Sequence, residues 1–161
     1  MNEVDPIRTK TEMWAIKSYF LKRWKVRNYL MFALGVNSAL RISDLLGIKV
    51  KDVRKPNGKL KEKLHLREGK TNKEKKYKIS KNGKEALGFY FKYIEPEKFY
   101  GHEEVKQEDY LFASQKEPHT PINRTWAWSL IKRAARDVGI SENISCHSLR
   151  KTWGYMARKY E

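Results

Sequence analysis

The segment from Val26 to Val36 restricts the fold more than any other, because nearly all of its side chains are apolar. In a helix of this composition Leu30, Phe32 and Leu34 would point in different directions around the axis, so no face would be left for water. A helix that is apolar all round has to be enclosed by the rest of its domain. The sequence therefore predicts a helix at the centre of the fold, which ends near Asn37.

Apolar side chains recur at helical spacing in several other segments, and capping residues mark where these helices begin. Asn123 is a candidate N-cap, as are Ser43 and Ser145. Pro96 is expected to end the helix that precedes it. We expect helices over residues 9–23, 82–94 and 123–138, a short one after Ser43, a last one after Ser145, and loop over 97–121 around a short 110–112 segment.

The last two helices each carry an apolar stripe that we expect to face the core. The opposite side of the final helix carries His147 and Arg150, which are close enough in sequence to share one face. The expected core stripes are Trp126, Leu130, Ala134 and Val138 in the first of these helices, and Leu149, Trp153 and Met156 in the second.

In the middle of the chain the apolar period changes from helical to two residues. Leu64 and Leu66 alternate with basic side chains before a turn at Gly69–Asn72, and Tyr77 and Ile79 do so after it. This alternation predicts an antiparallel hairpin with one strongly basic face. The predicted fold class is α+β, mainly α-helical with one small antiparallel β-hairpin.

The charge balance indicates the kind of partner. The chain has 161 residues, 40% of them apolar, and carries a formal charge of +16. An apolar content this high indicates a folded domain, on which such an excess of positive charge indicates nucleic acid as the partner. No apolar span or amphipathic anchor suggests a membrane. The single Cys excludes a disulfide framework and suits a reducing compartment, so we expect a cytoplasmic protein.

Four residues supply the donors needed to bind a phosphodiester and protonate its leaving oxygen: Arg41, Lys70, His147 and Arg150. Arg binds two phosphate oxygens through a planar, permanently charged fork, whereas Lys can give up a proton. Arg41 follows the apolar helix at a break, where an unpaired buried charge would be costly, so we expect it at a cleft that faces an anion. Taken alone, Arg41 or Lys70 is more readily explained as a structural or solvated charge, and His147 with Arg150 as a short pattern that arises by chance; only the set in this order indicates a site.

Metal and cofactor chemistry is not expected at this site. No carboxylate cluster has metal-ligand spacing, and the four His residues are scattered, which disfavours metal-assisted cleavage. Cys146 is not expected to act as a nucleophile with His147, because adjacent helical side chains diverge by about 100°.

Three stretches of the sequence resemble the signature boxes of the tyrosine recombinases, the phage-type integrases. Ala39–Leu46 resembles the first-arginine box, Glu68–Lys75 the hairpin-lysine box, and His147–Thr152 the His-x-x-Arg box. The boxes occur in the family's order and at fitting spacing, and the similarity extends from about Pro6 to the last residue. Ala39 departs from the Gly that many members have.

The resemblance implies the integrase catalytic-domain fold and a role for each candidate residue. Arg41 and Arg150 would clamp the scissile phosphate, Lys70 would protonate the leaving 5′ oxygen, and His147 would assist proton transfer. The implied function is site-specific recombination or integration, in which DNA strands are broken and rejoined through a 3′-phosphotyrosine. The implied partners are double-stranded DNA and, in the full-length protein, further copies in a synaptic tetramer, with the protein at the nucleoid when bound to DNA.

The attacking tyrosine is the part that this chain is not expected to supply. If the last helix is continuous, Tyr155 lies about 140° from Arg150 around the axis, and Tyr160 lies about 80° away and about 15 Å further along. Tyr160 is expected to pack on the apolar stripe. Residues 1–161 are thus expected to be an integrase-like catalytic domain that lacks its C-terminal end and the N-terminal core-binding domain, and that is inactive for cleavage by itself. A tyrosine donated by a neighbouring subunit stays open.

Two other functions stay open at this point. The first is a non-catalytic remnant of a recombinase that binds double-stranded DNA without cutting it. The second is a structural or RNA-binding protein, although the aromatic residues lie mostly on predicted core stripes and form no base-stacking platform.

Overall fold

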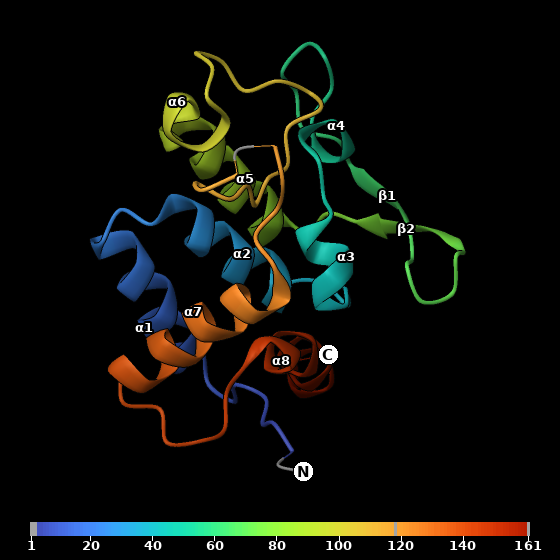
Figure 1. Ribbon diagram of the computed structural model, residues 1–161. Coiled ribbons are helices and arrows are strands. Elements are labelled where there is room, and N and C mark those ends of the chain that lie inside the picture. The colour runs from blue at the N-terminus through green and yellow to red at the C-terminus, as the bar shows by residue number, and fades with distance from the viewer. Residues whose placement is uncertain (1–2, 118, 161) are drawn as a thin grey trace.

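Helix α2 (Val26–Val36) is the centre of the fold. The computed structural model describes residues 3–117 and 119–160 (Figure 1), and in α2 every residue except Tyr29 is buried. Helices α1 (Lys10–Lys22), α3 (Ile42–Leu46), α5 (Lys81–Tyr93) and α8 (Cys146–Tyr160) all pack on it. The prediction of an enclosed central helix is confirmed.

Side-chain caps begin three of the long helices close to where the sequence predicted. Thr9 accepts a hydrogen bond from the Glu12 N–H at the start of α1. Ser80 and Asn123 cap α5 and α7 (Arg124–Asp137) in the same way. Because a cap satisfies backbone donors that the helix itself leaves unpaired, its position fixes where the helix begins.

A single antiparallel strand pair lies beside the helices in the described residues. Strand β1 (Lys63–Arg67) pairs with β2 (Glu74–Lys78), with Leu64 opposite Tyr77. Leu64 is buried on the side of the short helix α4 (Val50–Val53), while most other side chains of the pair are exposed. Figure 1 shows the hairpin projecting from the body beside α3. The predicted class, mainly helical with one small hairpin, is confirmed.

Two short helices were absent from the sequence prediction. Pro96 does not end α5, which already stops at Tyr93; it is instead the first residue of α6 (Pro96–Tyr100). Proline suits that position because the N–H it lacks would have no partner in a first turn. Helix α4 has only four residues, too few for an apolar period to show in the sequence.

The predicted core stripes of α7 and α8 are only partly correct. Trp126 is 48% exposed and Trp153 is 42% exposed. In α7 the buried side chains are those of Ala127, Ile131, Ala134 and Ala135, one position along from Trp126 and Leu130. Both rows are apolar, so spacing alone does not choose between them. The smaller row faces inward because α7 packs against its neighbouring helices along that side.

None of the helices in residues 3–117 and 119–160 combines the length and the apolar character needed to cross a bilayer.

Candidate active site

Arg41 occupies the junction between α2 and α3. Its backbone is extended, and its carbonyl accepts the first hydrogen bond of α3, from the Leu45 N–H at 2.9 Å. Arg41 therefore holds the N-cap position predicted for Ser43, which lies inside the helix instead. The Arg41 side chain is 31% exposed, so it is neither buried in the core nor fully solvated.

A buried carboxylate holds this arginine. The Glu68 side chain is only 3% exposed, and its Oε2 accepts a hydrogen bond from Arg41 Nη1 at 2.5 Å. Its Oε1 lies 2.8 Å from Lys75 Nζ. The Lys75 ammonium lowers the pKa of the Glu68 carboxyl below its usual range against the opposing effect of desolvation, and Arg41 lowers it further. Glu68 was not among the predicted site residues; the available signal was an acid placed between Arg67 and the turn that carries Lys70.

The ion pairs of Glu68 predict a pH-dependent term in stability. Because folding lowers the pKa of this carboxyl, the pairs stabilise the folded protein at neutral pH, and this contribution is lost as pH falls through the folded-state pKa. The advantage of the wild type over Glu68→Gln in urea midpoint should therefore shrink between about pH 6 and about pH 3. An advantage that stays constant over that range would contradict the ion-pair assignment.

Lys70 lies in a turn that backbone hydrogen bonds hold in place. The Gly69 N–H donates to Asp44 Oδ1 of α3 at 3.1 Å. The Asn72 N–H donates to the Glu68 carbonyl at 2.7 Å, and Asn72 takes the left-handed φ of 54° that closes the turn. The Lys70 side chain is exposed, and within the described residues its ammonium forms no ion pair. The hairpin tip is thus anchored to α3 while the Lys70 amine stays accessible.

His147 and Arg150 lie in the first turns of α8, where His147 is exposed and Arg150 is half-buried. Leu149 between them is 2% exposed and packs against Gly35 of α2. A Cβ atom at Gly35 would lie 2.5 Å from Leu149 Cδ1, so only glycine allows α8 to approach α2 this closely. The contact fixes the start of α8 at the last turn of α2, which leads directly to Arg41.

These contacts bring three distant segments to one region. Arg41 is joined to the Lys70 turn through Glu68, and the helix that carries His147 and Arg150 is joined to the end of α2. In the described part of the chain none of the four predicted residues forms a hydrogen bond with another of the set.

Among the residues that the structure describes, none forms a hydrogen bond with the hydroxyl of Tyr155 or Tyr160, the two tyrosines of α8. Tyr160 is 54% exposed, with the Lys10 ammonium 4.4 Å from its ring centroid, so the expectation that it packs on the apolar stripe is wrong. Tyr155 is half-buried. Burial raises the pKa of the Cys146 thiol to about 11, which keeps it protonated at neutral pH.

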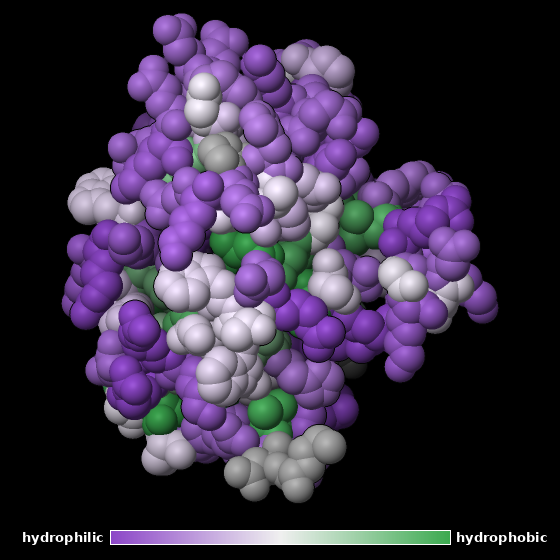
Figure 2. Space-filling view, viewed as in Figure 1, coloured by the Kyte–Doolittle hydropathy of each residue, from purple (hydrophilic) through white to green (hydrophobic). Residues whose placement is uncertain are grey.

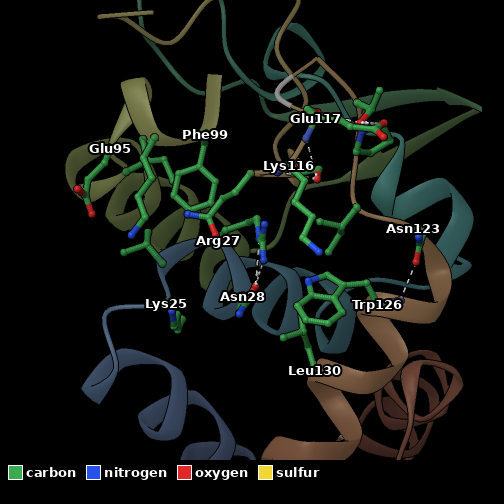
Figure 3. A pocket seen from close by; sticks show the side chains of 18 of the residues that line it. Lys25, Arg27, Asn28, Glu95, Phe99, Lys116, Glu117, Asn123, Trp126 and Leu130 are labelled. Atoms are coloured by element: carbon green, nitrogen blue, oxygen red, sulfur yellow. Dashed lines mark hydrogen bonds between the residues drawn. The ribbon is translucent and has the colours of Figure 1, made fainter. Parts of the chain in front are cut away.

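A cavity of about 500 Å³ lies between α2, α6, α7 and the segment before Asn123 (Figure 3). Arg27 is buried beside it and donates to Asn28 Oδ1 and to the Ala113 carbonyl. These bonds hold the 113 segment against α2, which is a structural role. None of the four predicted site residues lines this cavity.

The surface in view is mostly hydrophilic. Figure 2 shows that hydrophilic residues cover most of the projecting hairpin, while hydrophobic residues gather in the middle of the face.

Among the residues that the structure describes, no three His, Cys, Asp or Glu side chains gather in a way that could hold a metal ion.

Comparison with known proteins gives consistent matches. Residues 9–158 match the model of the phage integrase family. The chain is 37% identical over 155 residues to a "Probable integrase/recombinase YoeC" of Bacillus subtilis, an alignment that covers 96% of this chain and 75% of that protein.

Solved structures share the fold. A crystal structure of XerA recombinase superposes with a TM-score of 0.73 at 17% identity, covering 100% of this chain and 54% of that one. The XerH site-specific recombinase in a pre-cleavage complex with its difH substrate superposes with a TM-score of 0.69 at 17% identity, covering 98% of this chain and 44% of that one. The chain thus spans about half the length of these solved recombinases.

Proposed function

The chain belongs to the phage integrase family, the tyrosine recombinases, and on this premise we propose that it is the catalytic part of a site-specific DNA recombinase. The proposed reaction breaks and rejoins DNA strands through a 3′-phosphotyrosine intermediate. The observation that supports it best is the link between Arg41 and the turn that bears Lys70, made through the buried Glu68 carboxylate.

Each predicted residue has a proposed role. Arg41 and Arg150 bind the non-bridging oxygens of the scissile phosphate, because their permanent charge and planar fork match that group. Lys70 donates a proton to the leaving 5′ oxygen, and His147 assists proton transfer. Such a site works by positioning and by stabilising developing charge, which the contact of Arg41 with Glu68 and the anchoring of the turn that carries Lys70 support.

Double-stranded DNA is the proposed partner. The net charge of +16 and the exposed basic hairpin support it, and the similar XerH structure is described as bound to its difH substrate. We further propose that the whole protein assembles as a tetramer on paired DNA sites. Acting on DNA would place it in the cytoplasm, at the nucleoid when bound.

We place the attacking tyrosine outside residues 1–161, on a further segment of the protein or on a neighbouring subunit. The proposal is supported by Tyr155 and Tyr160, which are rotated from Arg150 around α8 by about 140° and about 80° respectively. Residues 1–161 would then form most of a catalytic domain, with DNA-clamping contacts from a separate core-binding domain. The same geometry supports the second candidate, a DNA-binding remnant that does not cut.

Duplex binding should be independent of metal and steeply dependent on salt. If the protein neutralises about six phosphates, its affinity should fall on the order of a thousandfold between about 50 and about 200 mM salt. Fluorescence anisotropy with a labelled duplex, in the presence of EDTA, measures this slope. A flat titration, or a requirement for Mg²⁺, would refute the proposed mode of binding.

The experiment that tests the proposed reaction uses a nicked duplex, which lets the cleaved fragment diffuse away and so traps the covalent intermediate. The protein is expressed from its full reading frame and incubated with this substrate. A covalent protein–DNA adduct supports the recombinase, whereas binding without an adduct would favour the non-cutting remnant.

A further inference from the structure

Glu68 is a buried acid in the most basic part of the molecule. Its side chain is 3% exposed, whereas the two cations that contact it, Arg41 and Lys75, are 31% and 55% exposed. Arg41 comes from the junction of α2 and α3, and Lys75 comes from β2. A single carboxylate therefore joins the hairpin to the helical body.

Stability alone does not explain a buried charge at this place. Taking a carboxylate out of water is costly, and replacing a buried ion pair with apolar residues of similar volume is often neutral or stabilising. The hairpin already has Leu64 to pack against the body. What the carboxylate adds is a directed contact with one particular guanidinium group.

That contact leaves the Nε–Nη2 edge of the Arg41 guanidinium group available to bind a ligand. Arg41 donates to Glu68 through Nη1, and within the described residues its Nε and Nη2 have no hydrogen-bond partner. The guanidinium group is planar and rigid, so fixing Nη1 also fixes the direction of the Nε–Nη2 edge. This edge has the two parallel donors that bind a phosphate in bidentate fashion.

Glu68 also closes the turn that carries Lys70. Its N–H donates to the Lys73 carbonyl at 2.9 Å, and its own carbonyl accepts from the Asn72 N–H at 2.7 Å. The residue that orients Arg41 through its side chain therefore shapes the Lys70 turn through its backbone, although Arg41 and Glu68 are 27 residues apart in the sequence.

We propose that Glu68 is a positioning residue of the active site, which sets the orientation of Arg41 and the place of Lys70 relative to it. This inference rests on the proposed function. Without the carboxylate, Arg41 and Lys75 would face each other as like charges and would separate, and the Lys70 turn would lose its link to Arg41.

The test compares Glu68→Gln with Glu74→Gln in the protein expressed from its full reading frame. Glu74 is exposed on the same hairpin, so both substitutions remove one negative charge from a chain of net charge +16, and the general attraction to DNA changes equally. At saturating protein, Glu68→Gln should slow single-turnover adduct formation by about ten- to a hundredfold, the loss expected when a reacting group is slightly misplaced. Its Kd for the duplex should match that of Glu74→Gln, whose cleavage rate should equal that of the wild type.

A substrate with sulfur in place of the leaving 5′ oxygen separates the two parts of the proposal. A thiolate leaves without a proton, so it makes Lys70 dispensable but not Arg41. The defect of Glu68→Gln should become smaller on this substrate without disappearing. A defect of unchanged size, or one seen equally in Glu74→Gln, would overturn the assignment.

Amide hydrogen exchange decides the positioning role even if the wild type forms no adduct, a result that would count against the proposed function alone. In Glu68→Ala the Gly69 and Asn72 amides should exchange at least about tenfold faster than in the wild type, since the turn loses its tie to Arg41. The same amides should be unchanged in Glu74→Ala. Equal exchange in the wild type and Glu68→Ala would overturn the proposal.

Discussion

Arg150→Ala should reduce strand cleavage by at least about a hundredfold in the protein expressed from its full reading frame. In the proposed reaction Arg150 would be a preorganised donor to the charge that develops on the phosphate, and removing one such donor costs about that much in rate. The preorganisation would come from its neighbour Leu149, which is packed against Gly35 without room for even one methyl group. The measurement is single-turnover adduct formation on the nicked duplex.

The matched control is Arg158→Ala. Arg158 is exposed near the other end of α8, so its loss removes the same charge from the same helix without touching the proposed site. Both variants should bind DNA with similarly reduced affinity, and only Arg150→Ala should lose cleavage at saturating protein. Equal cleavage rates in the two variants would remove Arg150 from the site.

Residues 1–161 by themselves should bind the duplex and form no covalent adduct. The proposed donors for the phosphate lie within these residues, but positioning is the larger part of phosphoryl-transfer catalysis, and Tyr155 and Tyr160 are rotated away from Arg150 around α8. Tyr160 is exposed at the far end of the helix and lies under the Lys10 ammonium. The nicked duplex measures this directly, with the full reading frame as the positive control.

Two variants test whether Tyr155 or Tyr160 is the nucleophile. Tyr155→Phe and Tyr160→Phe each remove one hydroxyl and leave the ring in place. An adduct formed by residues 1–161 and lost in either variant would show that the nucleophile has been misplaced. Adducts from the full reading frame that survive both substitutions agree with a tyrosine elsewhere.

The fold was largely predictable because its main signals are local. The apolar run of α2 requires enclosure, and the caps at Thr9 and Asn123 mark helix starts through bonds within one turn. Family membership, predicted from three short boxes, is confirmed by the match over residues 9–158. The errors fell where local pattern is ambiguous, as at Trp126, whose neighbour Ala127 is equally apolar and takes the inward position.

The site was predictable only in part, because its most informative contact is not local. Arg41, Lys70, His147 and Arg150 were selected by residue type and order, and their joint role remains a prediction. Glu68 was not predicted, because an acidic residue between basic residues in the sequence indicates a solvated charge. Only the folded arrangement reveals that it is buried against an arginine 27 residues earlier. The close contact of Leu149 with Gly35 was equally hidden, since α2 and α8 lie at opposite ends of the chain.

A structure of the protein bound to a nicked duplex is the sharpest test of the proposed active site. Arg41 and Arg150 should donate hydrogen bonds to non-bridging oxygens of the same phosphate, with the Lys70 amine within hydrogen-bond reach of its 5′ oxygen. Arg41 and Arg150 bound to separate phosphates, or one of them turned away from the DNA, would contradict it.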